Sequence, residues 1–234
     1  LCASQGTTQL KLIVHRPTTE AGKPLPVYFD VHGGGYVMGA PELSDDVNGP
    51  LAEEHSCIVV APSYRLAPET VFPGAVEDCY AALTWTYQHA KELGADVDRI
   101  VIGGKSAGGG LPAALGLLTR DRGEIPLAGQ LLLYPMLDDR TGSVRHPNPI
   151  LGQHIWTAEM NRFAWKCLLG TEPGGPDVSP YAAAARADDL SRLPPTHVFV
   201  GALDLFLDEN LDYAQRLIHA GVPTGLHVYP GAYH

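Results

Sequence analysis

Short apolar runs recur along this chain, and turn residues separate them, which predicts a series of buried strands. The segment Thr8–His15 first alternates polar with apolar residues and then runs apolar until Pro17, so we expect an edge or near-edge strand there. The other predicted strands are Val27–Val31, Cys57–Ala61, Arg99–Ile102, Ile125–Pro135, Thr196–Gly201 and Leu226–Tyr229.

Helical patterns lie between these strands. Gly74–Leu93 carries apolar residues at helical spacing and is followed by Gly94, and Leu205–Ala220 is followed by Gly221. Leu51–Ser56 resembles the end of a helix, and the sequence from Leu111 onward is also helical in character. Alternating strands and helices predict a single α/β domain over residues 1–234, with a mostly parallel sheet and helices on both faces.

The alternation breaks between Asp138 and Gly175. Loops rich in proline and glycine surround a predicted helix that would carry Trp156 and Trp165. Open α/β sheets bind ligands at the carboxyl ends of their strands. We therefore expect residues 139–175 to form a partial cap-type insertion over that edge.

Composition narrows the choice of partners. The 234 residues carry a net charge of −10, which disfavours nucleic acid and anionic lipid as partners. The four cysteines, Cys2, Cys57, Cys79 and Cys167, are scattered, so a disulfide framework or zinc site is not expected. No apolar run is long enough to span a membrane, and the first residues lack signal-peptide character, so we expect a cytoplasmic location.

The most informative stretch is Gly104-Lys105-Ser106-Ala107-Gly108, which lies between a predicted strand and a predicted helix. G-x-S-x-G in that context is typical of a nucleophile elbow, in which a sharp turn exposes the serine hydroxyl. A phosphate-binding loop would need G-x-x-x-x-G-K-[ST], and Arg99 occupies the position of its first glycine. A glycine-rich turn without catalytic function remains the alternative to the elbow.

A second glycine motif, His32-Gly33-Gly34-Gly35-Tyr36, follows the strand Val27–Val31. Such a loop can supply backbone N–H groups to a developing oxyanion, although a flexible glycine loop is the alternative. We expect the oxyanion donors to be the backbone amides of Gly34, Gly35 and Ala107.

Ser106, Asp204 and His234 each follow a predicted strand, in the chain order serine, acid, histidine. His234 would act as the base for Ser106, and Asp204 would orient the imidazole. Asp208 and Glu209 are alternative acids, but both fall inside a predicted helix. No metal-binding motif is present, and this chemistry requires no cofactor.

Together these motifs resemble those of the hormone-sensitive-lipase-like carboxylesterases, family IV of the bacterial lipolytic enzymes. The similarity covers HGGGY at 32–36, YRLAPE at 64–69, GKSAGGG around Ser106, LLLYPMLDDR at 131–140, and two segments at 193–209 and 220–234. The resemblance implies an α/β-hydrolase fold with a cap, and hydrolysis of short- to medium-chain esters. It also implies the same triad and oxyanion donors, with His32 shaping the glycine loop and Gly33, Gly104 and Gly108 completing the two motifs.

The sequence departs from the family pattern at several places. Lys105 stands where the family usually has aspartate, and Pro112 falls in the predicted helix, where it should bend or strain it. The family's amino-terminal cap helices and the helix that follows the catalytic histidine are not expected within this chain.

Two other functions remain open. A non-catalytic protein of the same fold could bind a small ligand, and an amidase or lactonase could use the same triad. We expect a small-molecule ester as substrate, and the sequence leaves a homo-oligomer open.

Overall fold

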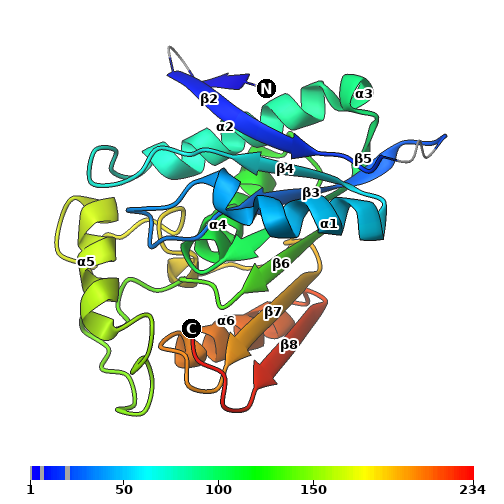
Figure 1. Cartoon of the computed structure of the whole chain (residues 1–234). Helices are drawn as coiled ribbons and strands as arrows, with labels where there is room; N and C mark the ends of the chain where they lie inside the picture. The colour runs from blue at the N-terminus through cyan, green and yellow to red at the C-terminus, as the bar shows by residue number, and fades with distance from the viewer. Residues whose placement is uncertain (1, 6–7, 19–21) are drawn as a thin grey trace.

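A continuous eight-stranded sheet organises the computed structural model, which describes residues 2–5, 8–18 and 22–234 and the side chains from residue 9 onward within these ranges. Its strand order is β1-β2-β4-β3-β5-β6-β7-β8 (Figure 1). The strands are β1 (Cys2–Gln5), β2 (Thr8–His15), β3 (Leu25–Val31), β4 (Ile58–Pro62), β5 (Ala95–Lys105), β6 (Gly129–Leu133), β7 (Thr196–Gly201) and β8 (Thr224–Tyr229).

Strand directions place the carboxyl ends of the sheet along one edge. β2 pairs antiparallel with β1 and β4, whereas the strands from β4 to β8 all pair in parallel. The predicted, mostly parallel sheet is therefore confirmed, with β2 one place from the edge.

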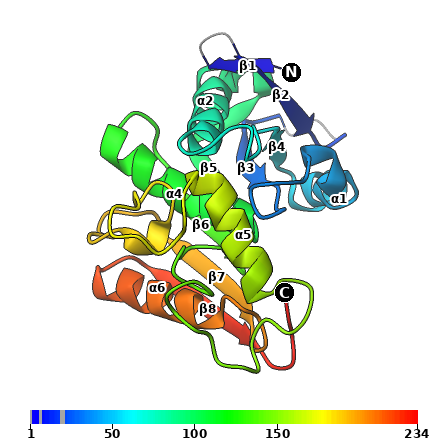
Figure 2. The same cartoon turned by 90° about the vertical axis from the view of Figure 1, so that its left-hand side faces the viewer.

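Helices cover both faces of the sheet, as predicted. Figure 2 shows α2, α4 and α6 along one face and α1 on the other. In both views α5 lies beyond the carboxyl ends of the central strands (Figures 1 and 2). The α-helices are α1 (Asp45–His55), α2 (Gly74–Gln88), α3 (Ala90–Leu93), α4 (Ala107–Arg122), α5 (Ala158–Leu169) and α6 (Leu207–His219), with 3-10 turns η1 (Pro41–Ser44) and η2 (Ala184–Arg186).

Several elements have other bounds than predicted, and two of the differences concern helices. The helix predicted over 74–93 divides at His89, whose ring lies 2.9 Å from the carbonyl oxygen of Trp85. Trp156 does not lie in α5, because Thr157 forms the N-cap by accepting a hydrogen bond from the Met160 amide. Pro112 lies inside α4, which continues from Ala107 to Arg122, and the bend or strain expected at this residue stays a prediction.

The core lies on both sides of α4, which is buried along most of its length. A large cluster contains Phe29, Ile102 and Leu115, and a second cluster contains Leu132 and Val198. Packing on both sides fixes α4, and with it the turn from which it starts.

The described cysteines form no disulfide. Cys57, Cys79 and Cys167 are free, and the side chain of Cys2 lies outside the described residues. No helix in the described part of the chain has both the length and the apolar character needed to cross a bilayer.

Candidate active site

Ser106 occupies the sharp turn between β5 and α4, with φ 59° and ψ −122°. Two glycines permit that turn. A Cβ on Gly104 would lie 2.1 Å from the carbonyl oxygen of Val31, and Gly104 has φ +151°. A Cβ on Gly108 would lie 2.0 Å from the same oxygen. Any larger residue at either position would push the elbow apart.

The Ser106 hydroxyl lies beside the ring of His234. Ser106 Oγ is 2.9 Å from His234 Nε2, although 128 residues separate them in sequence. The serine is 7% exposed and the histidine side chain 8% exposed. The pair is therefore mostly shielded from water, which strengthens the hydrogen bond and keeps its geometry.

Asp204 lies on the other side of the imidazole. Its Oδ2 is 2.9 Å from His234 Nδ1, and its Oδ1 accepts a hydrogen bond from the Phe206 amide at 2.9 Å. The carboxylate is fully buried. With Nδ1 protonated, this arrangement leaves Nε2 as an acceptor facing the serine.

The two alternative acids lie elsewhere. Asp208 is exposed on α6. Glu209 is buried, but its Oε1 accepts hydrogen bonds from the Leu137 and Asp138 amides, and burial raises its pKa well above the usual range. The structure therefore brings Asp204, not its neighbours, to His234.

Backbone hydrogen bonds join the loop that carries His234 to the loop that follows β7. Ala202 N donates to Tyr229 O, and Leu203 N donates to Ala232 O, at 2.9 and 2.8 Å. The His234 ring packs edge-on against Phe206 and Tyr134, with ring centroids 5.2 and 4.8 Å away. These contacts hold the imidazole between its two partners.

The glycine loop after β3 lies against the elbow. A Cβ built on Gly33 would lie 3.5 Å from Ser106 Cβ. His32 stacks on Tyr64 with centroids 4.2 Å apart, and the Tyr64 hydroxyl donates to His32 O. Burial lowers the pKa of His32, and its Nδ1 lies 2.8 Å from Gly33 O. These contacts support the expected shaping role of His32.

Three backbone amides near Ser106 have no acceptor. Among the described residues, the N–H groups of Gly34, Gly35 and Ala107 donate no hydrogen bond. Ala107 is the first residue of α4, so its amide also benefits from the positive end of the helix dipole. This arrangement can accept a negatively charged oxygen.

A cavity of about 530 Å³ opens onto these groups. Trp156 is buried in the core and also lines this cavity, whereas Tyr36, Trp165 and Phe206 are buried in the core and do not line it. Its lining residues are His32, Gly33, Gly34, Gly35, Met38, Gly39, Ala40, Leu43, Ser44, Lys105, Ser106, Tyr134, Ile155, Trp156, Met160 and His234.

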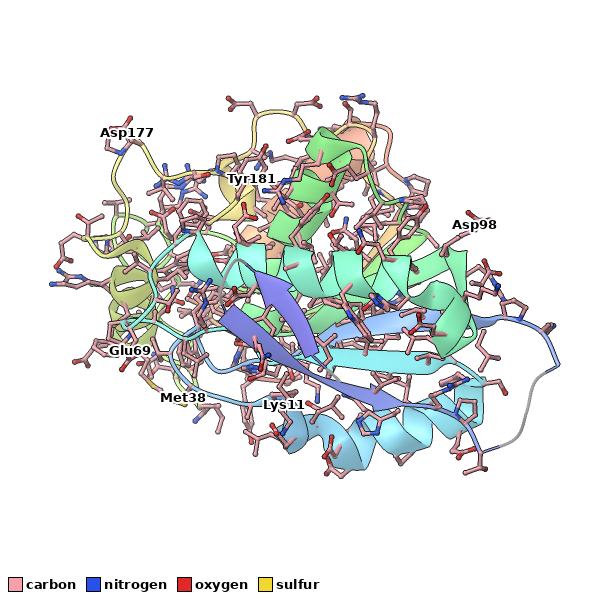
Figure 3. The ribbon with its side chains drawn as sticks, turned by 90° about the horizontal axis from the view of Figure 1, so that it is seen from above. Lys11, Met38, Glu69, Asp98, Asp177 and Tyr181 are labelled. Carbon is pink, nitrogen blue, oxygen red and sulfur yellow. The ribbon has the colours of Figure 1, made fainter. Side chains whose placement is uncertain are left out.

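The sequence motifs account for about half of this lining. Met38, Ile155 and Met160 come from segments without a recognisable motif, and only the fold brings them to Ser106. Figure 3 shows Met38 at the end of the molecule opposite Asp98, which lies in the first half of β5. The cavity therefore lies at the carboxyl edge of the sheet, where open α/β sheets bind ligands.

Metal ligands do not cluster in the part of the chain that the structure describes. No group of three or more His, Cys, Asp or Glu side chains there is arranged to hold an ion. The functional groups that face the cavity are the Ser106 hydroxyl, the His234 imidazole and free amides, and the Asp204 carboxylate lies buried on the far side of the imidazole.

Comparison with known proteins identifies relatives of this arrangement. Residues 27–234 match a protein family described as alpha/beta hydrolase fold. The chain is 36% identical to Esterase LipI of Mycobacterium tuberculosis over 212 residues, and 36% identical to Carboxylesterase NlhH of that organism over 234 residues. A solved bacterial heroin esterase superposes with a TM-score of 0.94 at 43% identity, over 100% of this chain and 75% of its own.

These relatives are longer than the chain. The aligned regions include 89% of this chain but 64% of Esterase LipI, and 98% of this chain but 72% of Carboxylesterase NlhH. The matches extend across both glycine motifs and all three triad positions, and the similarity in fold is equally extensive. The chain belongs to the hormone-sensitive-lipase-like carboxylesterase family of the α/β-hydrolase fold.

Proposed function

We propose that this protein is a serine carboxylesterase that hydrolyses short- to medium-chain acyl esters through an acyl-enzyme intermediate. The observation that carries the proposal is the continuous hydrogen-bonded series from Ser106 Oγ through His234 to Asp204, which opens onto a cavity with free amides. The names of its relatives, which are esterases, support the same reaction.

Acylation begins at Ser106. His234 Nε2 takes the hydroxyl proton as Oγ attacks the ester carbonyl, and the carbonyl oxygen becomes an oxyanion. Asp204 stabilises the imidazolium through Nδ1. The tetrahedral intermediate then collapses, the bond to the alcohol oxygen breaks, and His234 returns the proton to the leaving alkoxide.

Deacylation repeats these steps with water. His234 removes a proton from water, the resulting hydroxide attacks the acyl carbon, and the acid leaves as Ser106 regains its proton. The amides of Gly34, Gly35 and Ala107 stabilise the oxyanion in both halves, and each such donor is typically worth about 10² to 10³ in rate.

The cavity supports the proposed substrate size. Its volume of about 530 Å³ and its side chains, among them Met38, Leu43, Trp156 and Met160, suit a small acyl chain with a modest alcohol. Ile155, Trp156 and Met160 belong to the segment 139–175, which supports the proposal that this segment works as a cap over the substrate.

The test is hydrolysis of p-nitrophenyl esters with acyl chains from two to twelve carbons. We expect activity that peaks at short chains and falls at least 10³-fold in Ser106→Ala. Ser44→Ala is the matched control, because Ser44 is also 7% exposed and lines the same cavity, but its hydroxyl makes no hydrogen bond to a histidine among the described residues. Equal loss in both variants, or no loss in Ser106→Ala, would refute the proposal.

Covalent labelling and amide substrates separate the alternatives. A p-nitrophenyl phosphonate should add one phosphonyl group at Ser106, detectable by mass spectrometry, because only an activated serine reacts. A ligand-binding protein would show saturable binding without turnover or labelling. An amidase would hydrolyse the matched anilide about as fast as the ester.

A further inference from the structure

Lys105 directly precedes Ser106 and contributes to the lining of the cavity. It is the last residue of β5 and is partly exposed. Alternation along β5 places it on the same face as Gly103, whose register partner is Asp30. This face is the one that α1 covers, and Ser44, immediately before α1, lines the same cavity.

No acid within contact distance neutralises this charge. Lys105 makes no side-chain hydrogen bond or ion pair with any residue that the structure describes. Asp30 is near enough to interact electrostatically, but its Oδ2 already accepts a hydrogen bond from Asn48 at 2.9 Å. Burial also raises the pKa of Asp30, which disfavours its charged form and therefore weakens its attraction for the Lys105 ammonium group.

The rest of the cavity offers no competing acid. None of the described lining residues is aspartate or glutamate, and most are glycine or apolar side chains. An ammonium group in such a setting gains most from a substrate that brings the missing negative charge, because apolar walls limit screening by water.

We propose that Lys105 gives this enzyme a preference for esters that carry a second, ionised carboxyl group, such as monoesters of dicarboxylic acids. This inference rests on the proposed carboxylesterase function and specifies its substrate class. The carboxylate belongs either to the acyl part or to the alcohol part of the ester, and the ammonium group would pair with it in either case.

We expect Lys105 to produce a moderate preference for the charged ester. Lys105 is partly exposed, so the pairing lies between a screened surface ion pair and a buried one. We expect the charged ester to gain about tenfold in kcat/KM over its neutral isostere through Lys105. The net charge of −10 opposes this preference at long range, and added salt will reduce both effects.

The experiment compares kcat/KM for two matched pairs of esters. The acyl pair is mono-p-nitrophenyl glutarate against p-nitrophenyl valerate, and the alcohol pair is 4-acetoxybenzoate against 4-acetoxybenzamide. Each pair is measured on the wild type, Lys105→Met and Lys105→Arg. We compare the ratio of kcat/KM for the charged ester to kcat/KM for the neutral ester, because this ratio does not depend on the fraction of active enzyme.

We expect the ratio in at least one pair to fall about tenfold in Lys105→Met and to recover in Lys105→Arg. The pair that responds shows on which side of the ester the carboxylate lies. Equal ratios in wild type and Lys105→Met for both pairs would overturn the inference, whereas Ser106-dependent hydrolysis of the valerate ester would leave the proposed function intact.

A binding measurement covers the case in which no ester is hydrolysed. The Kd of each charged ester is measured by calorimetry on Ser106→Ala and on the double variant with Lys105→Met. Binding about tenfold weaker in the double variant would support the role of Lys105 even if the carboxylesterase proposal failed. Unchanged affinity for both esters would refute it.

Discussion

Replacing Asp204 with asparagine should nearly eliminate catalysis with little change in shape. The Phe206 amide donates to Oδ1 at 2.9 Å, so the asparagine oxygen must occupy that position. Its NH₂ group then faces His234 Nδ1, which must become an acceptor. The imidazole proton moves to Nε2, opposite the Ser106 hydroxyl, and the ring can no longer accept the serine proton.

The magnitude follows from the loss of the base. A wrong tautomer in such a triad lowers kcat by about 10³- to 10⁴-fold, equivalent to about 4 to 5.5 kcal/mol of activation free energy. KM for p-nitrophenyl acetate should change much less, because Asp204 is fully buried and does not line the cavity. The assay is initial-rate hydrolysis of that ester at pH 8.

Asp208→Asn is the matched control, since it makes the same change four residues later at an exposed position on α6. We expect its kcat to stay within about twofold of the wild type. If Asp204→Asn folds normally and loses less than tenfold in kcat, the reasoning from the Phe206 hydrogen bond is wrong.

Three further changes test the scaffold, each followed by urea unfolding. Gly104→Ala should cost more than about 3 kcal/mol and abolish activity, whereas Gly123→Ala, with φ +68° and open space around it, should cost about 1 kcal/mol. Similar costs would contradict the packing argument. Tyr64→Phe should cost about 1 to 3 kcal/mol, because it leaves the carbonyl of His32 without its donor; no loss would mean that another group satisfies that oxygen. Burial raises the pKa of Tyr80 to about 12, so folding favours its protonated form and stability should fall as pH rises from 10 to 12. Tyr80→Phe should reduce this fall, and an unchanged pH dependence would exclude the assignment.

The parts of the fold that the sequence predicted are those set by local pattern. β2 and β7 have the predicted bounds, because alternation and flanking turn residues mark both ends. The elbow and the glycine loop were equally visible, since unusual backbone conformations require glycine at fixed spacing. The three residues Ser106, Asp204 and His234 could also be selected from the sequence, because each of them follows a predicted strand.

The remaining features depend on individual hydrogen bonds and contacts that the hydrophobic pattern does not encode. At the break between α2 and α3 the His89 ring lies 2.9 Å from the carbonyl oxygen of Trp85, a contact that the hydrophobic periodicity does not predict. Trp156 was expected within a helix, yet Thr157 caps α5 just after it and leaves the indole against the cavity. Lys105 was visible as an unusual neighbour of Ser106, but its place in the cavity lining and its position near Asp30 depend on the fold.

The position of His234 has a consequence for how the enzyme loses activity. Its loop is carried by β8, an edge strand that is exposed along four of its six residues and hydrogen-bonded to β7 alone among the described strands. Ser106, in contrast, starts from β5 near the middle of the sheet. Edge strands open in local fluctuations that cost far less than global unfolding. Ser106 and His234, which we propose as nucleophile and base, thus belong to regions of unequal stability, and we expect inactivation by heat or denaturant to follow the fraying of this edge strand while the core is still folded.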